Sequence, residues 1–127
     1  VGSEMCIRDS MGPEAIIGLS VSNAAELEAS RSLAAAGVVD YLGIGPIEST
    51  STKPDAAAPL GLPGFAALAA VKPCPVVAIG SVKIHNAAAL AAAGADGIAV
   101  VSAICGTADP RAASEALLAA FRSGLKK

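Results

Sequence analysis

The amino-acid sequence predicts an α/β fold built on a parallel sheet, on the basis of three observations. Short apolar runs alternate four times with segments of helical periodicity, which is typical of consecutive βα units. Apolar residues make up 54% of the chain but aromatic residues only 2%, and such small side chains suit helices packed closely on strands that are buried on both faces. The length of 127 residues corresponds to one modest domain.

The first eleven residues do not follow this pattern. Residues 1–10, VGSEMCIRDS, are polar, mixed in charge and without helical or strand periodicity. We therefore interpret residues 1–11 as a disordered or artefactual leader that is foreign to the fold, and residues 12–127 as the folded region.

The first two βα units follow this leader. Residues 15–21 (AIIGLSV) predict a buried strand, and Ser22 and Asn23 offer N-cap chemistry for a helix that ends near Ala36. Residues 39–45 (VDYLGIG) predict the second strand. Residues 63–71, which open on a proline, predict the second helix.

The last two units have the same form. Residues 75–80 (PVVAIG) and 97–102 (GIAVVS) predict the third and fourth strands. Asn86 is expected to cap a helix over residues 87–93. Asp109, which a proline follows, is expected to cap the last helix.

A helix end, a glycine, an aspartate and a strand recur in AAAGVVDYLGIG (34–45) and AAAGADGIAVVS (91–102). Such repetition fits a (β/α)8 barrel, of which four units are half. A doubly wound sheet fits the periodicity almost as well, so the pattern leaves both architectures open. Half a barrel has two open sheet edges, and nothing in the sequence covers them.

Composition and charge exclude several classes of function. The net charge is −2 and no Lys/Arg cluster is interleaved with aromatic residues, so we expect no nucleic-acid partner. No apolar run has the roughly 18 residues of a membrane span. Three widely spaced cysteines fit neither a zinc site nor a disulfide framework. With no secretory signal, we expect a cytoplasmic protein that does not contact membranes.

Ligands of parallel α/β folds bind at the carboxyl ends of the strands. Residues 45–54 (GPIESTSTKP) combine four hydroxyls with Lys53, which suits an anion cradle but is also the composition of an ordinary polar loop. Gly80 and Ser81 suit either a close approach of backbone N–H groups to a phosphate or a tight turn. Val101 and Ser102 suit a phosphate site beside a short extra helical turn.

Three other polar residues are assigned structural roles. His85 is the only histidine and has no Cys, Asp or Glu at ligand spacing, so we expect it in a loop or cap. Asp40 and Asp96 precede strands, at the opposite end of the sheet, and are expected to be turn or cap residues. The sequence contains no carboxylate cluster of the kind that holds Mg²⁺, so it predicts no metal site in this chain.

The same residues resemble the thiamine phosphate synthase family. The matching stretches are IIGLSVSN (16–23), VDYLGIGPI with TSTKPDA (39–56), PLGL (59–62), PVVAIG (75–80) and AGADGIAVVSAI (93–104). The GPI…TSTK stretch is the most specific of them. The resemblance implies a (β/α)8 TIM-type barrel of which this chain holds the C-terminal half, strands five to eight.

The resemblance also implies a transferase of thiamine biosynthesis. It joins hydroxymethylpyrimidine diphosphate to thiazole phosphate and releases diphosphate, with Mg²⁺ whose acidic ligands are expected in the N-terminal half. This chain alone is therefore expected to be inactive. By position, Lys53 and Ser20 match catalytic residues, and the expected ligands of the two anions are Thr50, Thr52 and Lys53 for diphosphate and Gly80, Ser81, Val101 and Ser102 for thiazole phosphate.

Two departures from the family pattern lie at this site. The family has an aromatic–proline pair where this chain has Glu48 and Ser49, and the Glu48 charge is expected to weaken diphosphate binding. The family has Gly-Gly where this chain has Gly80–Ser81, and a required positive φ would strain the serine. Two other functions remain open: an isomerase similar to thiazole tautomerases, and a non-catalytic phosphate-binding half-barrel that self-associates through its open sheet edges.

Overall fold

A computed structural model describes residues 3–49 and 58–125. One parallel sheet contains four strands in the order β1-β2-β3-β4, so strands that are consecutive in the chain are also neighbours in space. Their bounds are β1 Gly18–Val21, β2 Tyr41–Ile44, β3 Val76–Ile79 and β4 Gly97–Ala99. The predicted α/β fold with a parallel sheet is confirmed.

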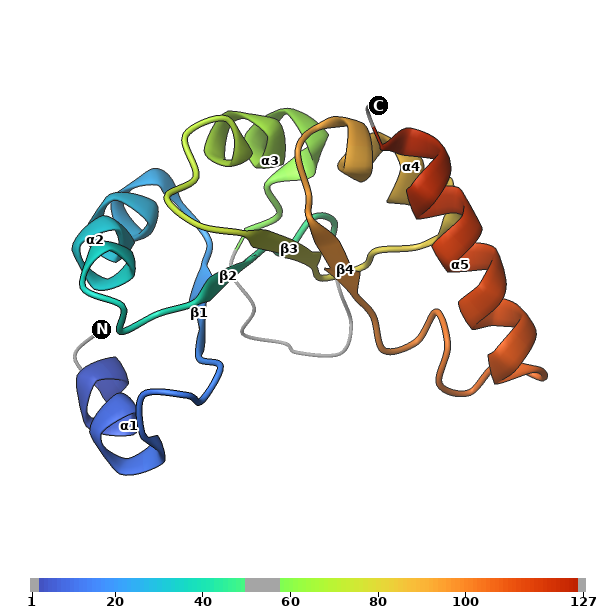
Figure 1. Ribbon diagram of the computed structural model, residues 1–127. Coiled ribbons are helices and arrows are strands. Elements are labelled where there is room, and N and C mark those ends of the chain that lie inside the picture. Colours follow the sequence, from blue (N-terminus) through green and yellow to red (C-terminus); the bar gives the residue numbers. More distant parts are fainter. Residues whose placement is uncertain (1–2, 50–57, 126–127) are drawn as a thin grey trace.

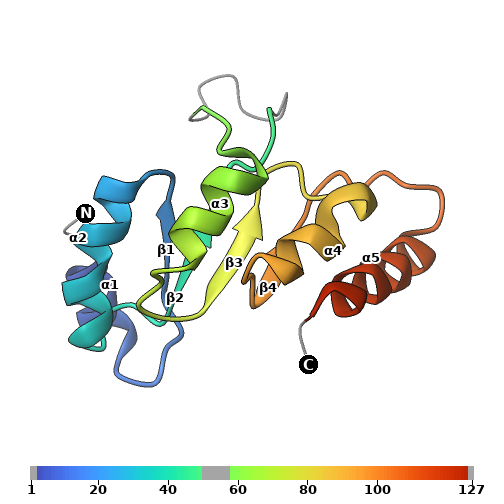
Figure 2. The ribbon, with the colours of Figure 1, turned by 90° about the horizontal axis from the view of Figure 1, so that it is seen from above.

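Four helices follow the strands and arc around one face of the sheet (Figure 1). They are α2 Ala24–Ala35, α3 Gly61–Ala69, α4 Ile84–Ala92 and α5 Pro110–Gly124. The view from above shows the same one-sided arrangement (Figure 2). Within the described residues no helix covers the other face, as expected for a section of a barrel.

The core lies between the sheet and these helices. Leu42 and Ile44 of β2 and Phe65 of α3 are completely buried. Successive residues of a strand face opposite sides of the sheet. Tyr41 and Gly43, which alternate with Leu42 and Ile44 in β2, therefore face the uncovered side. The outer layer is tightly packed as well, since a Cβ added to Gly124 of α5 would lie 1.9 Å from the carbonyl oxygen of Ala88 in α4.

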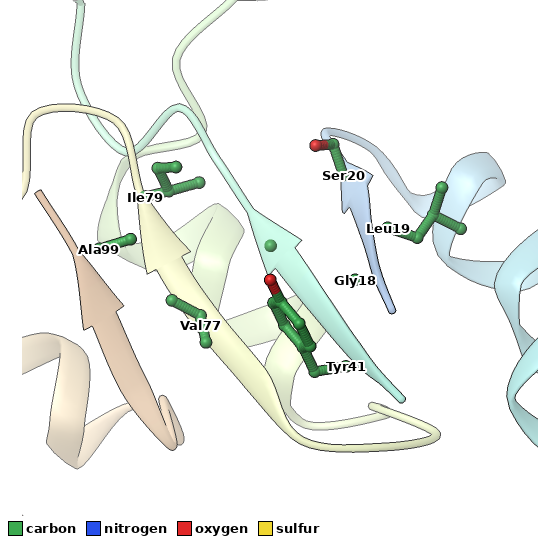
Figure 3. Close-up of a pocket in the computed structure, with 8 residues that line it drawn as sticks. Gly18, Leu19, Ser20, Tyr41, Val77, Ile79 and Ala99 are labelled. Atoms are coloured by element: carbon green, nitrogen blue, oxygen red, sulfur yellow. The ribbon is translucent and has the colours of Figure 1, made fainter. Parts of the chain in front are cut away.

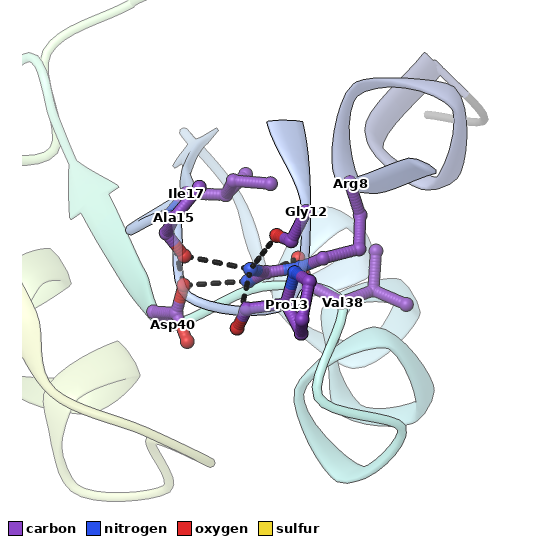
Figure 4. A network of polar contacts seen from close by, with 7 residues as sticks. All are labelled: Arg8, Gly12, Pro13, Ala15, Ile17, Val38 and Asp40. Atoms are coloured by element: carbon purple, nitrogen blue, oxygen red, sulfur yellow. Dashed lines mark hydrogen bonds and ion pairs between the residues drawn. The ribbon is translucent and has the colours of Figure 1, made fainter. Parts of the chain in front are cut away.

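The N-terminal segment differs from the expected disordered leader, because residues Ser3–Met11 form a helix, α1. Its Arg8 guanidinium donates to three carbonyl groups in the turn that leads to β1, the closest being Ala15 O at 2.6 Å. It also donates to Val38 O at 3.2 Å and to Asp40 Oδ2 at 2.6 Å (Figure 4). Partners up to 32 residues away hold this helix, which is why local periodicity did not predict it.

The aspartates before β2 and β4 have the same role in the two halves of the sheet. Asp40 Oδ2 accepts from Ile17 N at 2.8 Å, and Asp96 Oδ2 accepts from Val76 N at 2.9 Å. Each also forms an ion pair: Asp40 lies 2.6 Å from the Arg8 guanidinium, and Asp96 lies 2.8 Å from the Lys72 ammonium. Both therefore connect neighbouring strands at the amino end of the sheet, and the repeat seen in the sequence is also a structural repeat.

We expect these two carboxylates to make the fold sensitive to acid. The Ile17 N–H, and then Arg8, hold the pKa of Asp40 below its ordinary value. Partial burial raises the pKa of Asp96, but hydrogen bonds from Lys72 and Val76 outweigh it and the net shift is downward. A depressed folded pKa adds stability above the unfolded pKa of about 3.9. This stability is lost as the pH falls through the folded values.

Urea unfolding between pH 6 and pH 3 measures this effect. The midpoint should fall at the acid end, and the fall should be smaller in Asp40→Asn and Asp96→Asn. Glu28→Gln is the control, because Glu28 is an exposed carboxylate that pairs with Arg31 in the same helix. An unchanged pH profile in both Asp variants would contradict the prediction.

Candidate functional site

The uncovered face of the sheet is hollowed. A cavity of about 350 Å³ is lined by residues of all four strands, and the predicted catalytic residue Ser20 is one of them, exposed near the end of β1 (Figure 3). The ring of Tyr41 lies over Gly18, where an added Cβ would come within 2.2 Å of it. The lining residues are Gly18, Leu19, Ser20, Tyr41, Gly43, Val77, Ile79 and Ala99.

The turn after β3 has two consecutive residues with positive φ. Gly80 has φ 89° and Ser81 has φ 63°. Gly80 is also closely packed, since an added Cβ would lie 2.6 Å from Pro46 Cα. The conflict expected at Ser81 is present, because its side chain is carried on a left-handed backbone that favours glycine.

The two departures from the family pattern meet in space. The Ser81 hydroxyl donates to the carbonyl oxygen of Ser49 at 3.0 Å. The backbone also joins the two loops, since Ile47 N and Glu48 N donate to Gly80 O at 3.0 and 3.3 Å. The loop after β2 is therefore attached to the turn after β3 by its backbone and by the hydroxyl of the unexpected serine.

Glu48 is directed at the start of α4. Its Oε2 lies 2.9 Å from His85 Nε2 and accepts from Asn86 Nδ2 at 2.7 Å. His85, then Asn86, hold the pKa of Glu48 below its ordinary value, and the charge of Lys83 has the smallest effect. Glu48 is thus an ionised carboxylate, and its Oε2 already has two partners. His85, which we expected in a loop or cap, lies in the first turn of α4.

The start of α4 differs from the prediction. The helix begins at Ile84, three residues before the predicted start, with Lys83 at the N-cap position. Asn86 is not the cap but the third helical residue, and its Oδ1 accepts from the Lys83 N–H at 2.8 Å. This reverse bond stabilises the first turn in a way that a cap at Asn86 would not.

Val101 and Ser102 lie in an exposed turn after β4, which ends at Ala99 rather than at the predicted Ser102. Ser102 Oγ accepts from Lys83 Nζ at 2.9 Å. The turns after β3 and β4, which hold the predicted phosphate ligands, are therefore joined by Lys83. Sequence reasoning missed Lys83, because a lysine before a helix gives no sign of a partner 19 residues away.

The predicted diphosphate ligands Thr50, Thr52 and Lys53 lie outside the described residues. Within the described ranges no group of three His, Cys, Asp or Glu side chains is placed to hold a metal ion. The carboxylate near the carboxyl ends of β2 and β3 is that of Glu48, which has the partners given above.

Comparison with known sequences gives consistent matches. The family model for thiamine monophosphate synthase matches residues 5–104. A thiamine-phosphate synthase of Laribacter hongkongensis is 53% identical over 113 residues, which cover 89% of this chain and 51% of that protein. One of Azorhizobium caulinodans is 49% identical, covering 84% and 49%. The chain thus spans about half the length of the curated relatives it matches.

Solved structures give the same match. A thiamine phosphate pyrophosphorylase from Pyrococcus furiosus has a TM-score of 0.76 and 34% identity, and the superposition covers 99% of this chain and 57% of that one. A structure described as native KDPGal, 24% identical with a TM-score of 0.66, is similar in fold alone. No helix in the described ranges is both long and apolar enough to cross a membrane.

Proposed function

The chain belongs to the thiamine monophosphate synthase family, and from this membership we propose that it is the C-terminal half of a thiamine-phosphate synthase barrel. The reaction proposed for the complete barrel joins hydroxymethylpyrimidine diphosphate to thiazole phosphate and releases diphosphate. The partners of the site are then two small phosphorylated molecules.

The observation that carries this proposal is the family match over residues 5–104, and within the structure it is supported by the 2.9 Å contact between Lys83 Nζ and Ser102 Oγ. It brings together the turns after β3 and β4, from which the thiazole phosphate ligands Gly80, Ser81, Val101 and Ser102 are expected. Neighbouring turns at the carboxyl end of a parallel sheet can direct backbone N–H groups at one anion. The hollow that holds Ser20 opens on the face that becomes the interior of the closed barrel.

In the proposed mechanism the protein mainly stabilises charge. The bond between the pyrimidine methylene carbon and the diphosphate oxygen breaks, and the thiazole nitrogen attacks the resulting carbocation. Lys53 and the hydroxyls of Thr50 and Thr52 bind the departing diphosphate, where fixed donors and a cation lower the barrier. From its match to the family pattern, Ser20 is proposed to lie beside the reacting atoms.

Mg²⁺ would offset charge on the diphosphate in this family. From the family pattern we propose that its acidic ligands lie in the other half of the barrel. In the described chain, β1 and β4 each pair with one neighbour only. We propose that the N-terminal half of the barrel pairs with both of these edge strands. The alternative is that a second copy of this chain pairs with them.

The test is to join this chain to the N-terminal half of the Laribacter hongkongensis relative and to assay diphosphate release. We expect release that needs both substrates, no release by the isolated chain, and a loss of activity in Lys53→Ala. Turnover by the isolated chain would contradict the half-barrel proposal. A folded joined protein that releases no diphosphate would contradict the synthase and favour the tautomerase-like isomerase, and full diphosphate release in Lys53→Ala would contradict the role of Lys53.

A further inference from the structure

We propose that the Lys83 ammonium binds the phosphate group of the thiazole substrate directly, and so selects the phosphorylated substrate over the unphosphorylated one. This inference rests on the proposed function, because it takes the turns after β3 and β4 as the site of that phosphate. It adds a side-chain cation to a site whose other expected ligands are backbone N–H groups and a serine.

The backbone holds Lys83 in place on both sides. Its N–H donates to Asn86 Oδ1 at 2.8 Å, and its carbonyl accepts from the N–H groups of Asn86 and Ala87 at 3.2 and 3.0 Å. The side chain extends from the N-cap of α4 to Ser102 Oγ, 2.9 Å from Nζ. The ammonium is therefore positioned between two turns at the carboxyl end of the sheet.

The charge of Lys83 has no carboxylate partner in the described parts of the chain, whereas Arg8, Arg31, Lys72 and Arg111 each form an ion pair. Among the described residues the ammonium donates to one partner, the neutral hydroxyl of Ser102, and an ammonium has three donors. Glu48, the nearby acid, is bound to His85 and Asn86 instead. A bound anion would supply the missing negative charge.

The Ser102 hydroxyl also favours a phosphorylated substrate. Because its oxygen accepts from Lys83, its own O–H is available to donate to a phosphate oxygen. In the turn that follows, Ile104 N and Cys105 N donate to Val101 O at 3.2 and 2.7 Å. Within the described ranges neither the Ser102 N–H nor the Ala103 N–H has an acceptor, so both are available to an anion bound at this turn.

The test measures binding to the 127-residue chain by NMR titration, with inorganic phosphate, thiazole phosphate and the unphosphorylated thiazole alcohol as probes. Lys83→Gln should weaken binding of both phosphates roughly tenfold, the size expected for one charge-assisted hydrogen bond. Binding of the alcohol should not change. Lys83→Arg should retain most of the phosphate affinity, and Arg122→Gln, which removes an exposed cation from the end of α5, should retain all of it.

The outcomes separate this inference from the proposed function. Equal phosphate affinity in Lys83→Gln and the unchanged chain would overturn the role of Lys83, and so would an equal loss for the alcohol and the phosphate. A folded chain that binds no phosphate would overturn it as well. The synthase itself is tested separately, by diphosphate release from the joined barrel.

Discussion

Replacing Gly80 with alanine is expected to destabilise the fold by about 3 kcal/mol or more, from two additive costs. A left-handed backbone at φ 89° costs a residue with a Cβ about 1–2 kcal/mol. The added Cβ would also lie 2.6 Å from Pro46 Cα and 2.7 Å from Pro46 Cβ, and close packing leaves no room to relieve such an overlap without moving backbone.

The loop at Pro46 cannot easily move away from Gly80. Gly80 O accepts from the backbone of Ile47 and Glu48, and Leu60 N donates to Pro46 O at 2.8 Å. Gly37→Ala is the matched control, because its φ is 74° but nothing lies within 4 Å of the added Cβ. Urea unfolding should show only the backbone cost of about 1–2 kcal/mol for this variant. Equal losses at the two glycines would mean that the Pro46 contact contributes nothing.

Replacing Phe65 with alanine is expected to cost about 3–5 kcal/mol. Phe65 is completely buried, and it is one of only two phenylalanines in the chain. Its neighbours in the core are mainly aliphatic and small, so a cavity of that size cannot be filled by rotation of a large side chain nearby. Since domains of this size have only about 5–15 kcal/mol of stability, this variant should be largely unfolded at moderate urea.

Leu62→Ala is the control for Phe65→Ala. Both residues belong to α3, but Leu62 is 41% exposed, so its truncation should cost less than about 1 kcal/mol. The measurement is the urea midpoint of each variant, followed by far-UV circular dichroism. Similar losses for the two variants would contradict the assignment of Phe65 to the core between α3 and the sheet.

The order and type of the elements from β1 onward could be predicted from the sequence, because each strand is a short apolar run and each helix has a local signal. Asn23 accepts from Glu26 N at the start of α2, and Asp109 accepts from Ala112 N at the start of α5, as their positions indicate. Strand lengths were overestimated. The apolar run from residue 15 includes Ile16, which is 81% exposed, because an apolar run alone does not show which residues pair.

The features that escaped prediction depend on contacts between distant residues. The helix α1 is held by Arg8 through partners as far away as Asp40. The Ser81–Ser49 bond joins two loops across 32 residues, and the Glu48–His85 pair joins a loop to the first turn of α4 across 37 residues. Periodicity and caps describe only neighbours in sequence, so they assigned these residues one at a time and could not pair them.

The close contact of Gly124 with Ala88 also has an evolutionary consequence. A single methyl group added to Gly124 would have to displace a helix, whereas a change of polarity on the exposed side of α5, for example at Arg122, displaces nothing. Sequence drift in this layer is therefore limited by side-chain volume rather than by polarity. We interpret the apolar but aromatic-poor composition of the chain as a consequence of this size limit.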